Sequence, residues 1–417
     1  MDGHLKSKII AQYDENKRQH AGLRYTVPSP DTYPYQWFWD SCFHAIALSY
    51  FDIERAKEEL CLLLRGQFKN GMIPHIIYWH RVKSSPFPDI QWGKRHTSSI
   101  TQPPLLAAAV WRIYEADGDK DFVKQILPHI HAFHRYLFSA RDPKKMNLVG
   151  LINPDESGED NSPRYDQILH LKDPRHQFVD NFRARLELVD DWKRSRYVVK
   201  KQIELNHWVY DVPYNAILAE SLRLTTLLAE AVNEHRIANY SRTKSVNVRN
   251  AMRSKLLHHN LFQPVAGPKL RHIHTRTWAL FAPLYAGVAS KDEAKYLVEN
   301  YLRNKREFSL PFGIPTVSIS EQSFDPSGDW KGDWWVGTNW RGPVWMATNW
   351  LIMQGLLRYG YTKDAQRIYK TSLRLANQSG LREYYDPLTG KGHGAKGFSW
   401  AGLLFDMEAL SIYIDNN

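Results

Sequence analysis

Long apolar segments alternate with amphipathic ones along this chain, and that alternation constrains its fold more than any other feature. Residues 344–359 are apolar on most sides and end at Gly360, whereas residues 363–377 carry basic side chains along one face. A helix that is apolar all round is buried, and a helix with one apolar stripe covers another element. The sequence therefore predicts pairs in which a buried inner helix is followed by an outer helix that covers it.

Six such pairs predict an all-α fold, the (α/α)6 barrel, in which six inner and six outer helices form a six-hairpin toroid. The inner and outer members are 40–50 with 53–65, 102–113 with 120–139, 211–228 with 241–257, 275–286 with 290–302, 344–359 with 363–377, and 400–413 with 4–18. The last pair joins the two ends of the chain, so we expect residues 1–417 to form a single domain. Within 120–139, Pro128 should impose a kink or a break.

Three long stretches show no clear helical pattern. They lie near 66–100, 144–207 and 304–340, and each follows an outer helix and precedes an inner one. Connections of that kind emerge at the same end of a barrel, and loops on a rigid scaffold are where functional residues concentrate. We therefore expect these insertions to build the functional face.

Composition and charge exclude several classes of protein. The net charge is +11, but the basic residues are scattered, and the densest stretch, 242–259, has the helical spacing of a solvated face, so we expect no nucleic-acid partner. No apolar run approaches the roughly 18 residues of a membrane helix, and the charged N-terminus lacks the apolar stretch of a signal peptide. Cys42 and Cys61 are the two cysteines, too few for a disulfide framework or a cysteine-based zinc motif. We expect a cytoplasmic protein without a membrane partner.

Tryptophan is unusually abundant and clustered. The chain has 15 tryptophans, and two groups of them lie beside acidic residues: Trp37 and Trp39, then Trp330, Trp334, Trp335, Trp340, Trp345 and Trp350. Indole rings among carboxylates suit the apolar C–H faces and hydroxyl edges of sugars. Core packing remains the alternative for Trp37 and Trp345.

Two clusters of carboxylates lie far apart in the chain. Residues 155–160 (DESGED) hold four carboxylates, and Glu383 and Asp386 lie in the segment LREYYDPLTG. Glycoside hydrolysis needs two carboxyl groups, one to protonate the leaving oxygen and one to activate water or attack carbon. A hydrated acidic turn is the alternative for the first cluster, and a β-turn with an exposed glutamate is the alternative for the second.

Six motifs, taken together and in order, resemble glycoside hydrolase family 63, most closely its bacterial mannosylglycerate and glucosylglycerate hydrolases and more distantly trehalase. They are 33–41 (YPYQWFWDS), 101–104 (TQPP), 156–162 (ESGEDNS), 339–345 (NWRGPVW), 383–390 (EYYDPLTG) and 398–400 (FSW). The resemblance covers nearly the whole chain and implies the (α/α)6 barrel that the helix pairs also predict.

The resemblance implies an inverting reaction with Asp160 as the general acid and Glu383 as the general base. The substrate would be an α-linked glucose or mannose on a small polar aglycone such as glycerate, and no cofactor or metal is implied. The other matched residues would line the sugar pocket: Tyr33, Trp37, Trp39, Asp40, Gln102, Trp340 and Trp345. For Asp40, capping of a helix N-terminus is the alternative role.

Two positions depart from the family pattern, and both lie close to the bound disaccharide in the glycerate-cleaving members. This chain has Asp155 where the family has an aromatic residue and Asn339 where the family has a tyrosine. Those members also place an arginine for the glycerate carboxylate within the insertion 144–207. Candidates for that role, or for ordinary solvated charges, are Arg194 and Arg196, with Lys193, Lys200 and Lys201 adding positive charge nearby.

Two other functions remain open. A sugar epimerase or isomerase on the same barrel would use histidines as acid and base, and His44, His75 and His393 are available. A sugar-binding protein without catalysis is the second alternative. A metal site is not expected, because the cluster of His129, His131 and His134 lacks Asp or Cys partners nearby.

Overall fold

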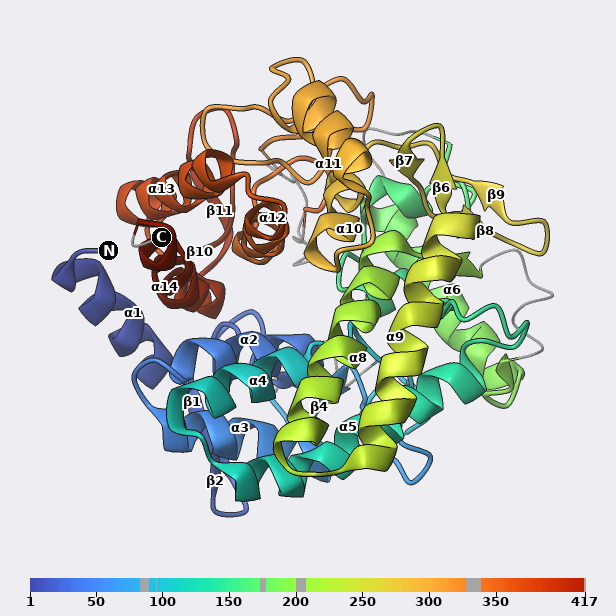
Figure 1. Ribbon diagram of the computed structural model, residues 1–417, viewed down its shortest axis with the longest axis vertical. Helices are drawn as coiled ribbons and strands as arrows, with labels where there is room; N and C mark the ends of the chain where they lie inside the picture. The colour runs from blue at the N-terminus through green and yellow to red at the C-terminus, as the bar shows by residue number, and fades with distance from the viewer. Residues whose placement is uncertain (83–89, 95, 173–177, 200–207, 328–338, 416–417) are drawn as a thin grey trace.

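The computed structural model is mostly helical (Figure 1). The structure describes residues 1–82, 90–94, 96–172, 178–199, 208–327 and 339–415. The helices that correspond to the predicted inner members are α2 (Phe38–Leu48), α4 (Leu106–Asp117), α8 (Val212–Ala231), α10 (Ala282–Tyr285), α12 (Met346–Arg358) and α14 (Leu403–Asp415). The outer members are α1 (Gly3–Glu15), α3 (Ile53–Arg65), α5 (Lys120–Ala140), α9 (His235–Lys255), α11 (Lys291–Leu297) and α13 (Thr362–Ser379).

The inner and outer helices differ in burial as their sequences predict. Every residue of α2 is buried, and most of α8 and α12 is buried as well. By contrast, α13 buries one stripe that includes Ile368, Tyr369 and Leu375. In Figure 1, α9 and α13 lie on the outside of α8 and α12. The apolar faces of each pair are thereby removed from water, which is the main stabilising contribution to such a fold.

Each inner helix packs against the next inner helix along the chain. Thus α2 contacts α4, α4 contacts α8, α8 contacts α10, α10 contacts α12, α12 contacts α14, and α14 contacts α2. The predicted meeting of the two chain ends is confirmed: Glu408 of α14 accepts a 2.5 Å hydrogen bond from the N-terminal ammonium group of Met1, and it forms a 2.9 Å ion pair with Lys6 of α1.

Two helices differ from the prediction for local reasons. The expected inner helix over 275–286 is a 3-10 turn, η4 (Trp278–Phe281), followed by the single turn α10. Pro283 lacks the N–H that would continue an α-helix from the preceding turn, so the α-helical part begins only there. Of the kink or break that the sequence predicts at Pro128, the break does not occur, because α5 runs through that residue without interruption.

Among the described residues, one helix occurs where none was predicted. The insertion 144–207 contains α6 (Phe178–Arg194), together with two 3-10 turns, η2 (Pro154–Ser157) and η3 (Pro163–Tyr165). Helix α6 has an apolar stripe that includes Phe182, Leu186 and Val189, at helical spacing. We therefore correct the prediction of a non-helical insertion.

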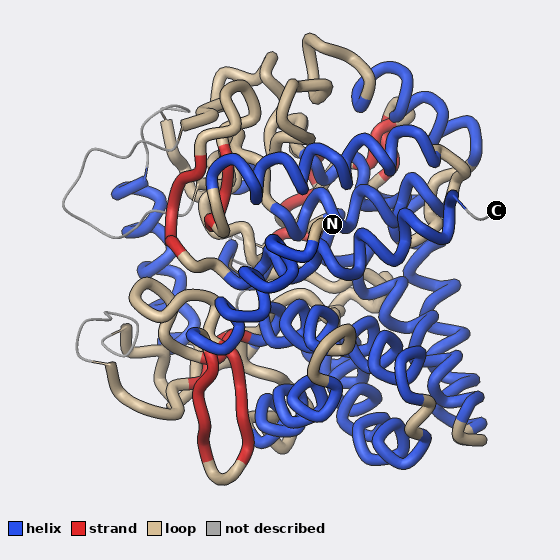
Figure 2. The backbone as a smooth tube through the Cα atoms, turned by 90° about the vertical axis from the view of Figure 1, so that its left-hand side faces the viewer, coloured by secondary structure: helices blue, strands red, loops and turns tan. Residues whose placement is uncertain are grey.

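Short antiparallel strands brace the connections. The pairs are β1 (Lys17–His20) with β2 (Leu23–Thr26), β3 (Gln36–Trp37) with β4 (Ile76–Ile77), β6 (Leu257–His258) with β7 (Leu261–Phe262), and β10 (Arg382–Tyr385) with β11 (Gly392–Lys396). A three-stranded sheet has the order β5 (Val209–Tyr210), β8 (Val265–Ala266), β9 (Arg271–His272). In Figure 2, most of the strands and long loops lie in the left half of the view, and a short strand segment lies at the upper right. Within the described residues, no helix combines the length and apolar character that crossing a membrane requires.

Candidate active site

One cavity brings together segments from all parts of the chain. The empty space within its lining, including solvent at its open mouth, measures about 910 Å³. All nine residues singled out from the sequence line it: Tyr33, Trp37, Trp39, Asp40, Gln102, Asp160, Trp340, Trp345 and Glu383. The structure therefore places every predicted site residue around the same space.

The first turn of α2 supplies one wall of the cavity. Asp40 is buried there, and its Oδ1 accepts a 2.7 Å hydrogen bond from the indole Nε1 of Trp400. Burial raises the pKa of Asp40 to about 6, although His44 and the hydrogen bond from Trp400 oppose the rise. Gln102, in the loop before α4, accepts a 3.2 Å hydrogen bond from the backbone N–H of Trp39. These contacts fix the polar groups of the wall before any ligand arrives.

Stacked indoles line the cavity next to this wall, since the rings of Trp39 and Trp340 are 6.2 Å apart. The rings of Trp340 and Trp345 are 3.8 Å apart and 7° from parallel. The Nε1 of Trp345 donates to the backbone carbonyl of Asn339 at 2.8 Å, and the N–H of Trp340 donates to Oδ1 of Asn161 at 2.8 Å. Trp345 both packs in the core and lines the cavity, because it is buried and still borders the cavity.

Glu383 lies on β10 and is held from two sides. Its Oε2 accepts a 2.7 Å hydrogen bond from the N–H of Ala395 on β11, and its Oε1 accepts a 2.8 Å hydrogen bond from the hydroxyl of Tyr33. Burial raises the pKa of Glu383 to about 8; these two hydrogen bonds oppose the rise, and the charges of Asp160 and Asp40 add to it. The pKa of Tyr33 is raised well above its usual value by burial and by Glu383, so Tyr33 remains a donor.

Gly394 allows the hairpin to approach Glu383. Its φ is +65°, in the left-handed region, and a Cβ atom at this position would overlap the carboxylate of Glu383. We expect Gly394→Ala to destabilise the protein by about 1–2 kcal/mol and to lower kcat roughly tenfold or more, because small displacements of reacting groups are costly. Gly118→Ala is the matched control, since Gly118 also has a positive φ, of +70°, but has open space around it. An equal loss of kcat in both variants would contradict the proposed effect on Glu383.

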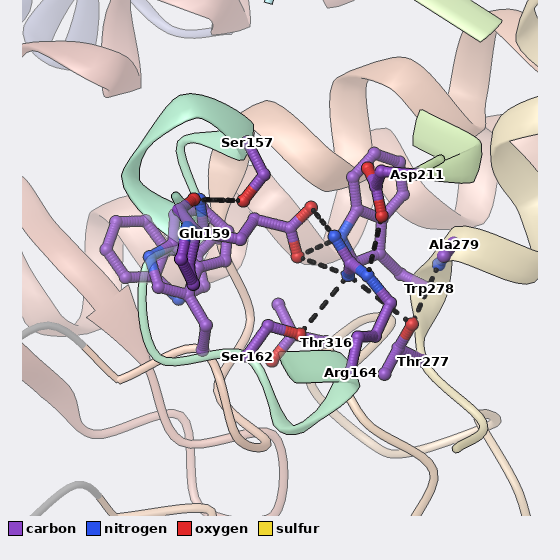
Figure 3. A network of polar contacts seen from close by, with 12 residues as sticks. Ser157, Glu159, Ser162, Arg164, Asp211, Thr277, Trp278, Ala279 and Thr316 are labelled. Atoms are coloured by element: carbon purple, nitrogen blue, oxygen red, sulfur yellow. Dashed lines mark hydrogen bonds and ion pairs between the residues drawn. The ribbon is translucent and has the colours of Figure 1, made fainter. Parts of the chain in front are cut away.

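The carboxylate cluster 155–160 divides into two functions. Glu156 is fully buried and pairs with Arg141 at 2.7 Å, and Glu159 is bound by Arg164 and by Nε1 of Trp278, each at 2.8 Å. Figure 3 shows Arg164 between Glu159 and Asp211, where its Nε donates to Asp211 at 3.1 Å. These ion pairs anchor the loop in the interior, so the alternative of a hydrated acidic turn does not apply to Glu156 and Glu159.

Asp155 and Asp160 instead line the cavity and share one cation. Both carboxylates contact Nη1 of Arg185 on α6, Asp160 at 3.2 Å and Asp155 through a short hydrogen bond. The Nε of Arg185 donates to Asn181 at 2.8 Å, which fixes the guanidinium along α6. Burial raises the pKa of Asp155 to about 6, with Arg185 opposing the rise and Asp160 adding to it. Gly158 makes this turn possible, because its φ is +74° and a Cβ atom there would overlap the ring of Trp39.

The arginine of the cavity is one that the sequence analysis missed. Arg185 lines the cavity, whereas Arg194 and Arg196 are exposed and do not. The side chain of Arg194 is 70% exposed and pairs with Asp191. Lys193 pairs with Asp190, and Lys200 and Lys201 lie outside the described residues, as do Trp330, Trp334 and Trp335. The helical spacing of Phe182, Leu186 and Val189 could have indicated the helix, but not the role of Arg185 on it.

The other departure from the family pattern has a structural role. Asn339 is fully buried, its Nδ2 donates to the carbonyl of Asp325 at 3.1 Å, and its Oδ1 accepts from the N–H of Arg341 at 2.8 Å. It is not one of the cavity-lining residues. Asn339 therefore shapes the loop that carries Trp340 rather than facing a ligand directly.

The three candidate histidines, His44, His75 and His393, do not form an acid–base pair in the cavity. His75 lines it, but burial, together with the charge of Arg185, lowers the pKa of His75 to about 3. His44 bonds to the hydroxyl of Ser399 at 2.6 Å, and His393 lies on β11; neither lines the cavity. Within the described ranges, no three His, Cys, Asp or Glu residues are grouped so that they could hold a metal ion.

Comparison with known proteins identifies close relatives. The family model described as the mannosylglycerate hydrolase MGH1-like glycoside hydrolase domain matches residues 33–401. A mannosylglycerate hydrolase of Thermus thermophilus is 34% identical, over 91% of this chain and 95% of that protein, and a glucosylglycerate hydrolase of Mycolicibacterium hassiacum is 28% identical, over 90% of this chain and 92% of that protein. A crystal structure of the family 63 mannosylglycerate hydrolase from Thermus thermophilus with Tris and D-glycerate superposes with a TM-score of 0.86, at 32% identity, over 99% of this chain and all of that one.

Proposed function

The chain belongs to the MGH1-like glycoside hydrolases of family 63, and we propose that its cavity cleaves an α-linked glucose or mannose from a small polar aglycone. The observation that carries this proposal is the joint presence of Asp160 and Glu383 in one aromatic cavity. The D-glycerate complex of the Thermus thermophilus enzyme supports a small aglycone.

We assign the two chemical steps to these two carboxyl groups. Asp160 donates a proton to the glycosidic oxygen, and Glu383 removes a proton from the water that attacks the anomeric carbon from the opposite face, so the configuration inverts. The hydrogen bonds from Ala395 and Tyr33 hold the Glu383 carboxylate in place as an acceptor. Its raised pKa makes it a stronger base once it has ionised. Inversion requires carboxyl groups roughly 6.5–9.5 Å apart, to leave room for the water.

The remaining lining residues bind the sugar that is released. Asp40 accepts hydrogen bonds from sugar hydroxyls, and Gln102 completes the polar edge beside it. The indoles of Trp37, Trp39, Trp340 and Trp345 cover the apolar faces of the ring and exclude bulk water, while Tyr33 positions Glu383. The polar groups at the start of α2 and the stacked indoles beside them support this division of roles.

The architecture that supports this site is an (α/α)6 barrel, formed by the whole chain as a single catalytic domain. The succession of contacts from α2 through α4, α8, α10, α12 and α14 back to α2 supports that arrangement. The insertions near 66–100, 144–207 and 304–340 contribute to the active-site face. A cytoplasmic location is part of the same proposal, supported by the free thiols of Cys42 and Cys61.

Proton NMR tests the reaction and its stereochemistry together. The protein is incubated with glucosylglycerate, mannosylglycerate, trehalose and short α-glucosides, and the released sugar is followed from the first minutes. We expect one of the small α-glycosides to release the β-anomer first, before mutarotation. The Glu383→Gln variant serves as the control for contaminating activity. First release of the α-anomer would indicate a retaining enzyme, and no release from any of these compounds would reject the proposed substrate class.

A further inference from the structure

The aglycone side of the cavity holds an internal ion pair. We propose that this side recognises an uncharged polyol or sugar rather than an anion such as glycerate, because the guanidinium of Arg185 is already paired with the carboxylate of Asp155. The proposal rests on the proposed glycosidase function and narrows its substrate class.

The position of the pair relative to the proposed acid locates it on the aglycone side. Asp160 must reach the glycosidic oxygen, which is the first atom of the leaving group. Arg185 contacts Asp160 at 3.2 Å through the same Nη1 that contacts Asp155. The sugar-binding residues we assign lie on other elements: at the start of α2, in the loop before α4 and in the loop before α12. A leaving group extending from Asp160 therefore meets Asp155 and Arg185.

The charge balance of the cavity disfavours an anion. Among the described lining residues, Arg185 is the one cation, whereas Asp40, Asp155, Asp160 and Glu383 all carry carboxyl groups. The side chain of Arg185 is 7% exposed, so an incoming carboxylate would have to displace Asp155 from a largely buried ion pair. Placing like charges side by side at such a site is strongly unfavourable. Hydroxyl groups carry no such penalty, and they can donate to Asp155 and accept from Arg185.

Two substrates that differ in a single group provide the test. An α-glycosylglycerate and the matching α-glycosylglycerol share the sugar and the linkage, and they differ in a carboxylate in place of a hydroxymethyl group. We expect kcat/KM of the wild-type protein to be at least about tenfold higher for the glycosylglycerol, which corresponds to about 1.4 kcal/mol. In Asp155→Asn, we expect the ratio to move at least about tenfold toward the glycerate, since Arg185 is released.

The ratio of two substrates on one enzyme cancels any general loss of turnover in the variant. Asp190→Asn is the matched control: it removes an equal charge from α6, but Asp190 is 55% exposed and pairs with Lys193. We expect Asp190→Asn to keep the wild-type ratio. A wild-type preference for the glycerate, or an unchanged ratio in Asp155→Asn, overturns the inference while leaving the glycosidase function standing.

Calorimetry with the free products separates the two proposals further. We expect D-glycerate to bind Asp155→Asn at least about tenfold more tightly than it binds the wild-type protein, with glycerol as the neutral comparison. Equal affinity for glycerate in both proteins overturns the inference, whether or not either glycoside is hydrolysed. Absence of hydrolysis of both glycosides by the wild-type protein rejects the proposed function for these aglycones. If Asp155→Asn does not fold, the ratio of kcat/KM for the two glycosides on the wild-type protein tests the inference by itself.

Discussion

Glu383→Gln is expected to lower kcat at least about a hundredfold while the protein still folds. Glutamine has nearly the same shape and still accepts a hydrogen bond through its Oε1, so the contact with Ala395 or Tyr33 can be kept. It cannot take a proton from water, and general acid–base groups contribute about 10²–10⁴ in rate. The measurement is kcat on the best substrate found. Turnover near that of the wild type would reject Glu383 as the base.

The same variant should change how stability depends on pH. The pKa of Glu383 is about 8 in the folded protein and 4.5 in its ordinary state, so the folded protein keeps a proton that the unfolded chain has lost between those values. This contribution to stability is fully present below about pH 4.5 and is lost as the pH rises toward 8. Glutamine does not ionise, so the Tm of Glu383→Gln should rise relative to the Tm of the wild type as the pH increases from 5 to 8. Glu187→Gln changes an exposed residue of α6, and its Tm should depend on pH as the Tm of the wild type does. The same pH dependence of Tm in Glu383→Gln and in the wild type would contradict the raised pKa of Glu383.

The helix pairs could be predicted because burial leaves a local pattern in the sequence. The all-round apolar character of α2 and α12 and the single stripe of α13 are visible in a window of about two turns. The motif residues could be gathered into one site because their resemblance to a family fixes them as a set, and the cavity contains all nine. The extent of α10 could not be predicted from apolar content, since a single proline decides where its helical hydrogen bonds begin.

The roles within 155–160 could not be separated from the sequence. Whether a carboxylate faces the cavity or the interior depends on partners that are distant in the chain or on other elements. Glu159 is buried because Arg164 and Trp278 meet it, and Trp278 is more than a hundred residues away. Arg185 was missed for a related reason: its helix has no motif, and its function follows only from the two aspartates that it contacts.

Asp160→Asn is expected to lower kcat at least about a hundredfold on a natural glycoside. Asparagine can still form a hydrogen bond near Arg185, so the fold should persist, but it cannot give a proton to the departing oxygen. An alkoxide is a poor leaving group, and general acid catalysis contributes about 10²–10⁴ for such a step. The measurement is kcat on the best glycoside, with the Tm of the variant confirming that it is folded. Near-normal turnover would reject Asp160 as the acid.

The leaving group distinguishes the acid from the base. Fluoride departs from an α-glycosyl fluoride as a stable anion without prior protonation, so Asp160→Asn should hydrolyse the fluoride of the preferred sugar within about tenfold of the wild-type rate. Glu383→Gln should remain at least about a hundredfold slower on the same fluoride, because water must still lose a proton as it attacks. Equal deficits of Asp160→Asn on the glycoside and on the fluoride would contradict the acid role and indicate that Asp160 acts on binding or on the geometry around Arg185 instead. If the hydrolysis rate on the fluoride recovered in Glu383→Gln but not in Asp160→Asn, Glu383 would be the acid and Asp160 the base.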